Sequence, residues 1–118
     1  MTNVARTYPA AAAAFIEKQR FAGPLYNHFD WGGYLIWRLP QLRVAIDGRM
    51  NVHGQDRIVR NTDTWLGKPS WRADSELAAA KIVIGPRDLP LASLLRLDER
   101  FKLAYEDPDG PAVVFVAR

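Results

Sequence analysis

The apolar run Ile82-Val83-Ile84 constrains the fold of this chain more than any other feature. It lies within residues 81–85, which are too few for a typical helix, and Pro86 follows it. A strand that is apolar at consecutive positions buries both of its faces, as the strands of helix-covered parallel sheets do. The run therefore predicts a central strand of a sheet with helices on both sides.

Strand and helix patterns alternate along the rest of the chain. Alternation of this kind produces parallel βαβ units, while the Asp-Pro-Asp-Gly-Pro stretch at residues 107–111 predicts a closing hairpin. We therefore expect an α/β domain of three layers, α/β/α, with a mixed, mostly parallel sheet of about five strands that ends in an antiparallel C-terminal hairpin. The expected helices run from near Pro9 to the Gly23-Pro24 break and over residues 31–39, 55–66, 70–80 and 90–97, and the expected strands are residues 25–29, 43–47, 81–85, 101–106 and 112–117.

The size and charge of the chain limit what it can be. Its 118 residues suit one hydrophobic core, and the halves on either side of residues 67–70 are too small to fold alone, so residues 1–118 are expected to form a single domain. The absence of cysteine excludes disulfides, thiolate metal sites and cysteine nucleophiles. The net charge is +3 and the basic residues are scattered, so no nucleic-acid partner is expected. No apolar run approaches the roughly 18 residues that a membrane span needs.

Side chains that can cap a helix precede four of the expected helices. Ser, Thr and Asp side chains accept hydrogen bonds from N–H groups of the first turn, which have no partners within the helix. The expected capping residues are Thr7, Asp30, Ser70 and Asp88.

Aromatic residues form a stripe on one expected helix and flank a loop farther along the chain. Trp31, Tyr34 and Trp37 recur at helical spacing, which favours a core position for Tyr34 and Trp37 and places Trp31 near the edge of the sheet. Trp65 and Trp71 flank a Gly-Lys-Pro loop and are candidates for a partly exposed patch.

Carboxylates follow the first two expected strands. Asp30 comes directly after residues 25–29, and Asp47 ends residues 43–47. The carboxyl ends of parallel strands meet at one edge, where open α/β sheets bind their ligands. Two carboxylates there can bind a metal, act as acid and base, or hold sugar hydroxyls. They can equally cap a helix and fix a loop, and the sequence favours this structural role.

Basic and imidazole groups accompany these carboxylates. Arg49 can grip a phosphate or carboxylate, although pairing with Asp47 is favoured because that partner is so close. His28 and His53 have the right donor atoms for a metal, but their spacing matches no metal motif, so we expect no metal and no cofactor. The chain has neither a phosphate-binding glycine loop nor a nucleophile elbow, and no catalytic residue is assigned.

Three segments carry a resemblance to a known class of proteins. The first is a helix followed by Gly-Pro over residues 9–24, and the second is Leu25-Tyr26-Asn27-His28-Phe29-Asp30-Trp31-Gly32-Gly33-Tyr34-Leu35-Ile36-Trp37. The third is Val44-Ala45-Ile46-Asp47-Gly48-Arg49 with His53-Gly54 after it. They resemble segments in the C-terminal soluble regions of polytopic bacterial membrane proteins that are similar to lipid-linked-sugar glycosyltransferases of the GT-C class. The resemblance extends over nearly the whole chain and is looser over residues 56–80.

This resemblance implies a non-catalytic accessory domain at the extracytoplasmic face of the bacterial inner membrane. Its partner would be the membrane-helix domain of the parent protein, and it would assist glycan or acceptor binding. Together with the residues at the expected sheet edge, the candidate ligand-binding residues are His28, Asp30, Trp31, Asp47, Arg49 and His53. The alternatives are a stand-alone small-molecule-binding module and a purely structural or dimerising α/β domain, with a homodimer as the partner.

Overall fold

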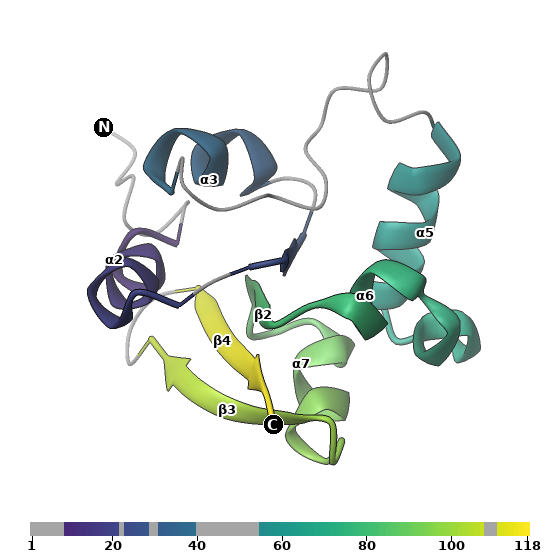
Figure 1. Cartoon of the computed structure of the whole chain (residues 1–118). Coiled ribbons are helices and arrows are strands. Elements are labelled where there is room, and N and C mark those ends of the chain that lie inside the picture. The colour runs from purple at the N-terminus through teal and green to yellow at the C-terminus, as the bar shows by residue number, and fades with distance from the viewer. Residues whose placement is uncertain (1–8, 22, 29–30, 40–54, 108–110) are drawn as a thin grey trace.

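The computed structural model describes residues 9–21, 23–28, 31–39, 55–107 and 111–118. Figure 1 shows the arrangement of helices and strands in this part of the chain. The helices are α2 (Ala10–Gln19), α3 (Gly32–Arg38), α5 (Gln55–Trp65), the 3₁₀ helix η2 (Pro69–Ala73), α6 (Ser75–Ala79) and α7 (Pro90–Arg96), and the strands are β1 (Leu25–Asn27), β2 (Ile82–Pro86), β3 (Phe101–Glu106) and β4 (Ala112–Ala117).

The described strands form a mixed sheet in the order β1-β2-β4-β3. β1 pairs with β2 in parallel, whereas β2 pairs with β4 and β4 with β3 in antiparallel fashion. Helices and a mixed sheet confirm the α/β class, and the C-terminal hairpin spans the expected residues. Among these strands the sheet is mainly antiparallel rather than mostly parallel, because β2 takes the hairpin strand β4 as its second neighbour. The strand expected at residues 43–47 lies outside the described residues.

The two faces of the sheet contribute to two separate hydrophobic clusters. Val83 and its neighbours pack with α5, η2, α6 and α7, whereas Ile82 and Ile84 pack with α2 and α3. Successive side chains of a strand point to opposite faces, so an uninterrupted apolar run supplies both clusters. In Figure 1 the two groups of helices lie at opposite sides of the molecule, with α2 and α3 at the left and α5, α6 and α7 at the right.

Helix α2 ends earlier than the sequence predicts. Its last turn closes at Arg20, which has a left-handed φ of 56° and donates its backbone N–H to the carbonyl of Glu17. A residue in the left-handed conformation commonly ends a helix. The helix therefore ends before the chain reaches Gly23-Pro24. The expected cap, Thr7, lies outside the described residues.

The helix expected over residues 70–80 is divided into η2 and α6. Asp74, rather than Ser70, caps the second piece, accepting hydrogen bonds from the N–H groups of Glu76 and Leu77 at 3.0 and 3.3 Å. The prediction for Ser70 is wrong because the chain makes a 3₁₀ turn there before the α-helix begins. Asp88 is not a cap either, since α7 begins after Leu89 without a side-chain cap.

Candidate functional site

The motif end of the sheet, defined here as His28 and Trp31, is where β1 leads into α3. The carbonyl of His28 accepts the N–H of Trp31 at 3.0 Å and the side-chain amide of Asn27 at 2.9 Å. The first bond links the residue after β1 to the residue before α3, and the second holds the Asn27 side chain at the end of the strand. The candidate residues Asp30, Asp47, Arg49 and His53 lie outside the described residues.

The side chains of His28 and Trp31 pack toward different clusters. The His28 ring lies 6.0 Å from that of Trp65, centroid to centroid, on the side of α5. Trp31 is 6% exposed and packs with Leu35 in the cluster of α2 and α3. The structure therefore joins the two candidate residues through their backbone and separates their side chains.

Helix α3 presents one tryptophan to solvent. The sequence predicts Trp37 in the core, but its side chain is 74% exposed. The buried residues Leu35 and Leu39 are four positions apart, and Trp37 lies midway between them, about 200° around the helix. Tyr34 is half-buried, and its ring lies 5.9 Å from that of Trp37 at an angle of 54°. Of these two aromatic residues, Tyr34 alone packs against the core as predicted.

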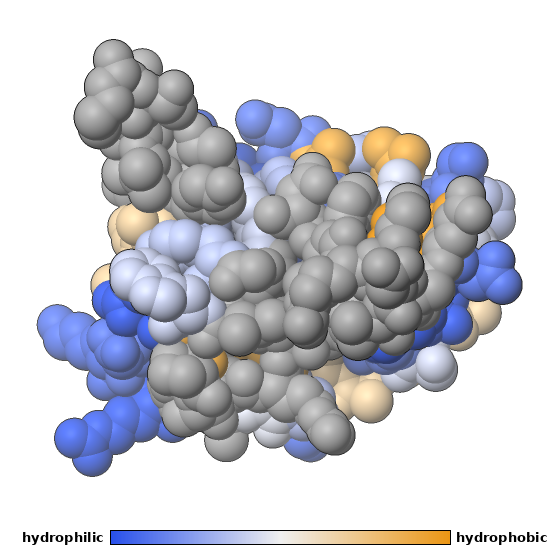
Figure 2. All heavy atoms as spheres, turned by 90° about the horizontal axis from the view of Figure 1, so that it is seen from above, coloured by the Kyte–Doolittle hydropathy of each residue, from blue (hydrophilic) through white to orange (hydrophobic). Residues whose placement is uncertain are grey.

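Seen from above, the described surface is mainly hydrophilic, with hydrophobic residues in small separate areas (Figure 2). The expected aromatic patch at the Gly-Lys-Pro loop is not among them. Trp65 and Trp71 are 0% and 7% exposed, and both belong to the cluster on the side of α5 and α7. That prediction is wrong because Trp65, at the end of α5, and Trp71, in η2, both face the core.

Sequence reasoning missed a buried carboxylate, that of Asp74. It is 2% exposed, and its Oδ2 accepts hydrogen bonds from the hydroxyls of Tyr26 and Thr64 at 2.9 and 2.7 Å. Its Oδ1 caps α6 and lies 3.8 Å from the Nε of Arg60. Burial, followed by the nearby negative charge of Asp74, raises the pKa of Tyr26, which therefore stays protonated as a donor.

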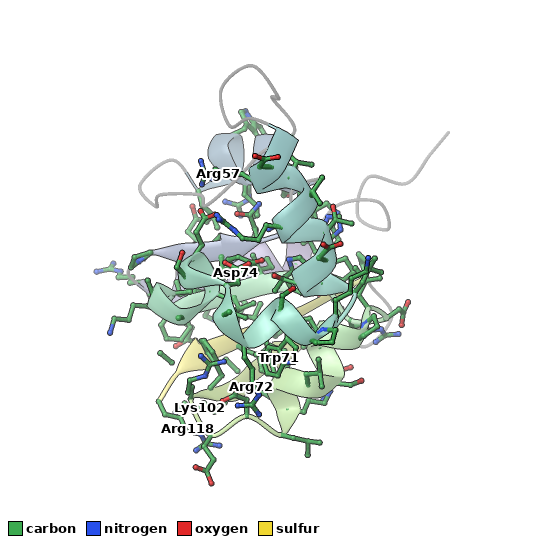
Figure 3. All side chains as sticks on the ribbon, turned by 90° about the vertical axis from the view of Figure 1, so that its right-hand side faces the viewer. Arg57, Trp71, Arg72, Asp74, Lys102 and Arg118 are labelled. Atoms are coloured by element: carbon green, nitrogen blue, oxygen red, sulfur yellow. The ribbon has the colours of Figure 1, made fainter. Side chains whose placement is uncertain are left out.

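Glu76 extends this polar group to the surface. Its carboxylate accepts hydrogen bonds from Arg57 and Arg60 of α5. Burial acts to raise the pKa of Glu76, but the hydrogen bonds from the two arginines outweigh it and lower the pKa below its usual value. Figure 3 shows Arg57 and Asp74 on the facing segments that this group connects.

The hydrogen-bonded group around Asp74, called the Asp74 group below, is better suited to holding helices together than to catalysis. Its members are Tyr26, Arg57, Arg60, Thr64, Asp74 and Glu76. Both oxygens of Asp74 are already occupied by donors, which leaves little capacity to accept a proton from a substrate. A sequence signal was present: Asp74 precedes Ser75 and Glu76, a pattern typical of a helix start. The polar partner Thr64 gave no such signal, because its burial depends on how α5 packs.

Neither a metal-binding cluster nor a membrane-spanning helix occurs in the described part of the chain. In the ranges given above, no three acidic or histidine side chains are grouped as metal ligands are. None of the helices in the same ranges is long and apolar enough to cross a bilayer.

Comparison with known proteins finds no match to a family pattern, to a curated protein or to a solved structure.

Proposed function

We propose that this chain is a non-catalytic accessory domain of a membrane protein similar to the lipid-linked-sugar glycosyltransferases, acting at the extracytoplasmic face of the bacterial inner membrane. Its motif end packs on the membrane-helix domain and assists binding of the glycan or acceptor. The proposal rests on the resemblance carried by the segment after β1 and by residues 44–49, and on one structural observation.

That observation is the exposure of Trp37. Helix α3 begins within the motif segment and is anchored by the buried Leu35 and Leu39, yet it leaves 74% of the Trp37 side chain in water. Arg38 ties the same helix to α2 through Glu17 at 3.0 Å, so α3 is held from two sides. Tryptophan is favoured at interfaces and at sugar-binding surfaces because its large ring combines an apolar face with a polar N–H.

We further propose that the complete domain has three layers and a fifth strand over residues 43–47, next to β1. Among the described strands, β1 has a partner on one side only, which is β2. A parallel strand there would bring Asp47 and Arg49 to the same end of the sheet as His28 and Trp31. The separate helix groups packed against Val83 and against Ile84 support the layered arrangement.

The reading frame around the chain tests the membrane assignment. It should encode several apolar runs of roughly 20 residues before residue 1. A stop codon directly upstream of a native start at Met1 would contradict the proposal.

Site-directed cross-linking tests which surface faces the membrane domain. Because the chain has no cysteine, Trp37→Cys gives a single attachment point within it for a photoreactive maleimide in the full-length protein. We expect cross-linked peptides that join this position to the membrane-helix part. Ser93→Cys, at an exposed position on α7, is the matched control and should give none. Equal cross-linking from both positions would exclude the Trp37 face of α3 as the specific contact.

A further inference from the structure

A groove lies at the opposite end of the parallel strands from the motif end. It has a volume of about 770 Å³, which is within the range of small-molecule sites. Gly23 and Lys81, which precede β1 and β2, line it, so it opens at the amino ends of these strands. It is therefore distinct from the surface discussed under the proposed function.

The walls of the groove combine apolar side chains with polar groups. Ile82, Val116 and Lys102 are aligned across β2, β4 and β3 by strand pairing. The aliphatic side chains of this row are joined by Ala104 of β3 and by the ring of Phe21, which follows α2. A ligand body placed here would leave water for a hydrocarbon surface.

The groove also carries two lysines, Lys81 and Lys102. Both are exposed, and within the described part of the chain neither forms an ion pair. Arg118 lies beside them, since its Nε donates to the carbonyl of Phe101 at 3.0 Å. Figure 3 shows Lys102 and Arg118 together at one end of the molecule.

The acidic residue Asp98, which precedes β3, does not neutralise these positive charges. It is paired with Arg100 at 2.9 Å, and the hydrogen bond from that guanidinium lowers the pKa of Asp98. Lys81, Lys102 and Arg118 therefore supply positive charge at the groove. A positive rim above an apolar wall is complementary to a molecule with a hydrocarbon body and an anionic head.

We propose that this groove binds an amphipathic anion, namely a hydrocarbon chain that ends in a phosphate or a carboxylate. The ammonium groups of Lys81 and Lys102 hold the head as point charges, and the chain lies against the partly exposed side chains of Phe21 and Ala104. Inorganic phosphate lacks the apolar body, and a neutral sugar lacks the charge. A ligand needs both the apolar body and the anionic head, because exposed ion pairs by themselves add little to the affinity.

Titrations followed by ¹⁵N–¹H correlation spectra test the proposal on the intact chain. Octyl phosphate and octanoate, both below their micelle concentrations, should give saturable shifts of the amides of Ile82, Lys102 and Val116. Butyl phosphate should bind at least roughly tenfold more weakly, because each buried methylene strengthens binding by roughly fourfold. Comparing the two octyl anions distinguishes a phosphate head from a carboxylate head.

Matched variants and neutral ligands separate charge from simple apolar binding. The affinity for octyl phosphate should fall roughly tenfold in the double variant Lys81→Gln/Lys102→Gln. The control variant Lys18→Gln/Lys68→Gln removes the same charge elsewhere and should leave this affinity unchanged. Octyl glucoside and inorganic phosphate should not give saturable shifts in these amides. Equal binding of octyl glucoside, unchanged affinity in the first variant, or shifts confined to other residues would each overturn the proposal. None of these outcomes depends on a membrane partner, so they leave the proposed function to its own tests.

Discussion

At the scale of single residues, the closest packing occurs between Gly85 and Trp65. A Cβ atom on Gly85 would lie 2.0 Å from Cη2 of Trp65, and the indole is fully buried. The ring cannot move aside without disturbing Tyr26, which stacks on it at 6.0 Å. Gly85→Ala should therefore lower the free energy of unfolding by about 3 kcal/mol, measured by urea denaturation.

A second substitution distinguishes this overlap from a general effect of alanine on the strand. Trp65→Leu removes the indole and is expected to be destabilising in its own right. In the double variant, Gly85→Ala should cost far less than in the parent chain. Additive free energies in this cycle would show that the contact between the two residues is not the cause.

The carboxylate of Asp74 gives another prediction at this scale. Asp74→Asn replaces one acceptor oxygen by an N–H₂ group, which must face the donors of Tyr26 and Thr64 or the N–H groups that cap α6. We expect a loss of about 3 kcal/mol in the free energy of unfolding, because a charged acceptor is lost and a buried donor is left without a partner. Tyr26→Phe, which removes only one donor, should cost about 1 kcal/mol. Equal stability of the Asp74→Asn variant and its parent would contradict this account.

At the scale of elements, the contact between α5 and α6 depends on pH through Glu76. The pKa of Glu76 is lowered in the folded chain, so its contribution is present above its ordinary value of 4.5 and is lost as the pH falls through the lower, folded-state value. We expect the midpoint of thermal unfolding to drop as the pH is reduced below about 4.5. Glu76→Gln should have a lower midpoint at neutral pH and a smaller drop on acidification. Identical pH profiles for the two proteins would exclude this contribution.

The helices and strands also show which features sequence patterns can predict and which they cannot. The hairpin strands β3 and β4 have the expected bounds, because alternation and turn residues are local signals. The apolar run of β2 likewise predicted a fully buried strand. The exposure of Trp37 and the burial of Trp65 were not predictable in this way, since they depend on the side of each helix that meets the sheet. The Asp74 group brings together residues as far as 48 positions apart, which no local pattern records.

At the scale of the whole molecule, β2 couples the two hydrophobic clusters. Ile84 and Val83 are adjacent in sequence but face different clusters, so loss of the sheet would open both. Ile84→Ala removes a fully buried side chain from the α2 and α3 side and should cost about 2 to 5 kcal/mol. The dispersed methyl signals of Leu77 and Leu91, which belong to the other cluster, should be lost at the same new midpoint as the far-ultraviolet circular-dichroism signal. Separate transitions would show that the clusters unfold independently.

Strand β3 ends the described sheet, and its form limits how molecules of this kind can associate. The strand is irregular between Leu103 and Tyr105, where the register with β4 shifts, and it carries the exposed charges of Lys102 and Glu106. A bulge and charged side chains discourage a neighbouring chain from adding a strand through backbone hydrogen bonds. Continuous growth of the sheet from one molecule to the next is thus disfavoured at this edge, which protects the concentrated protein against fibre formation.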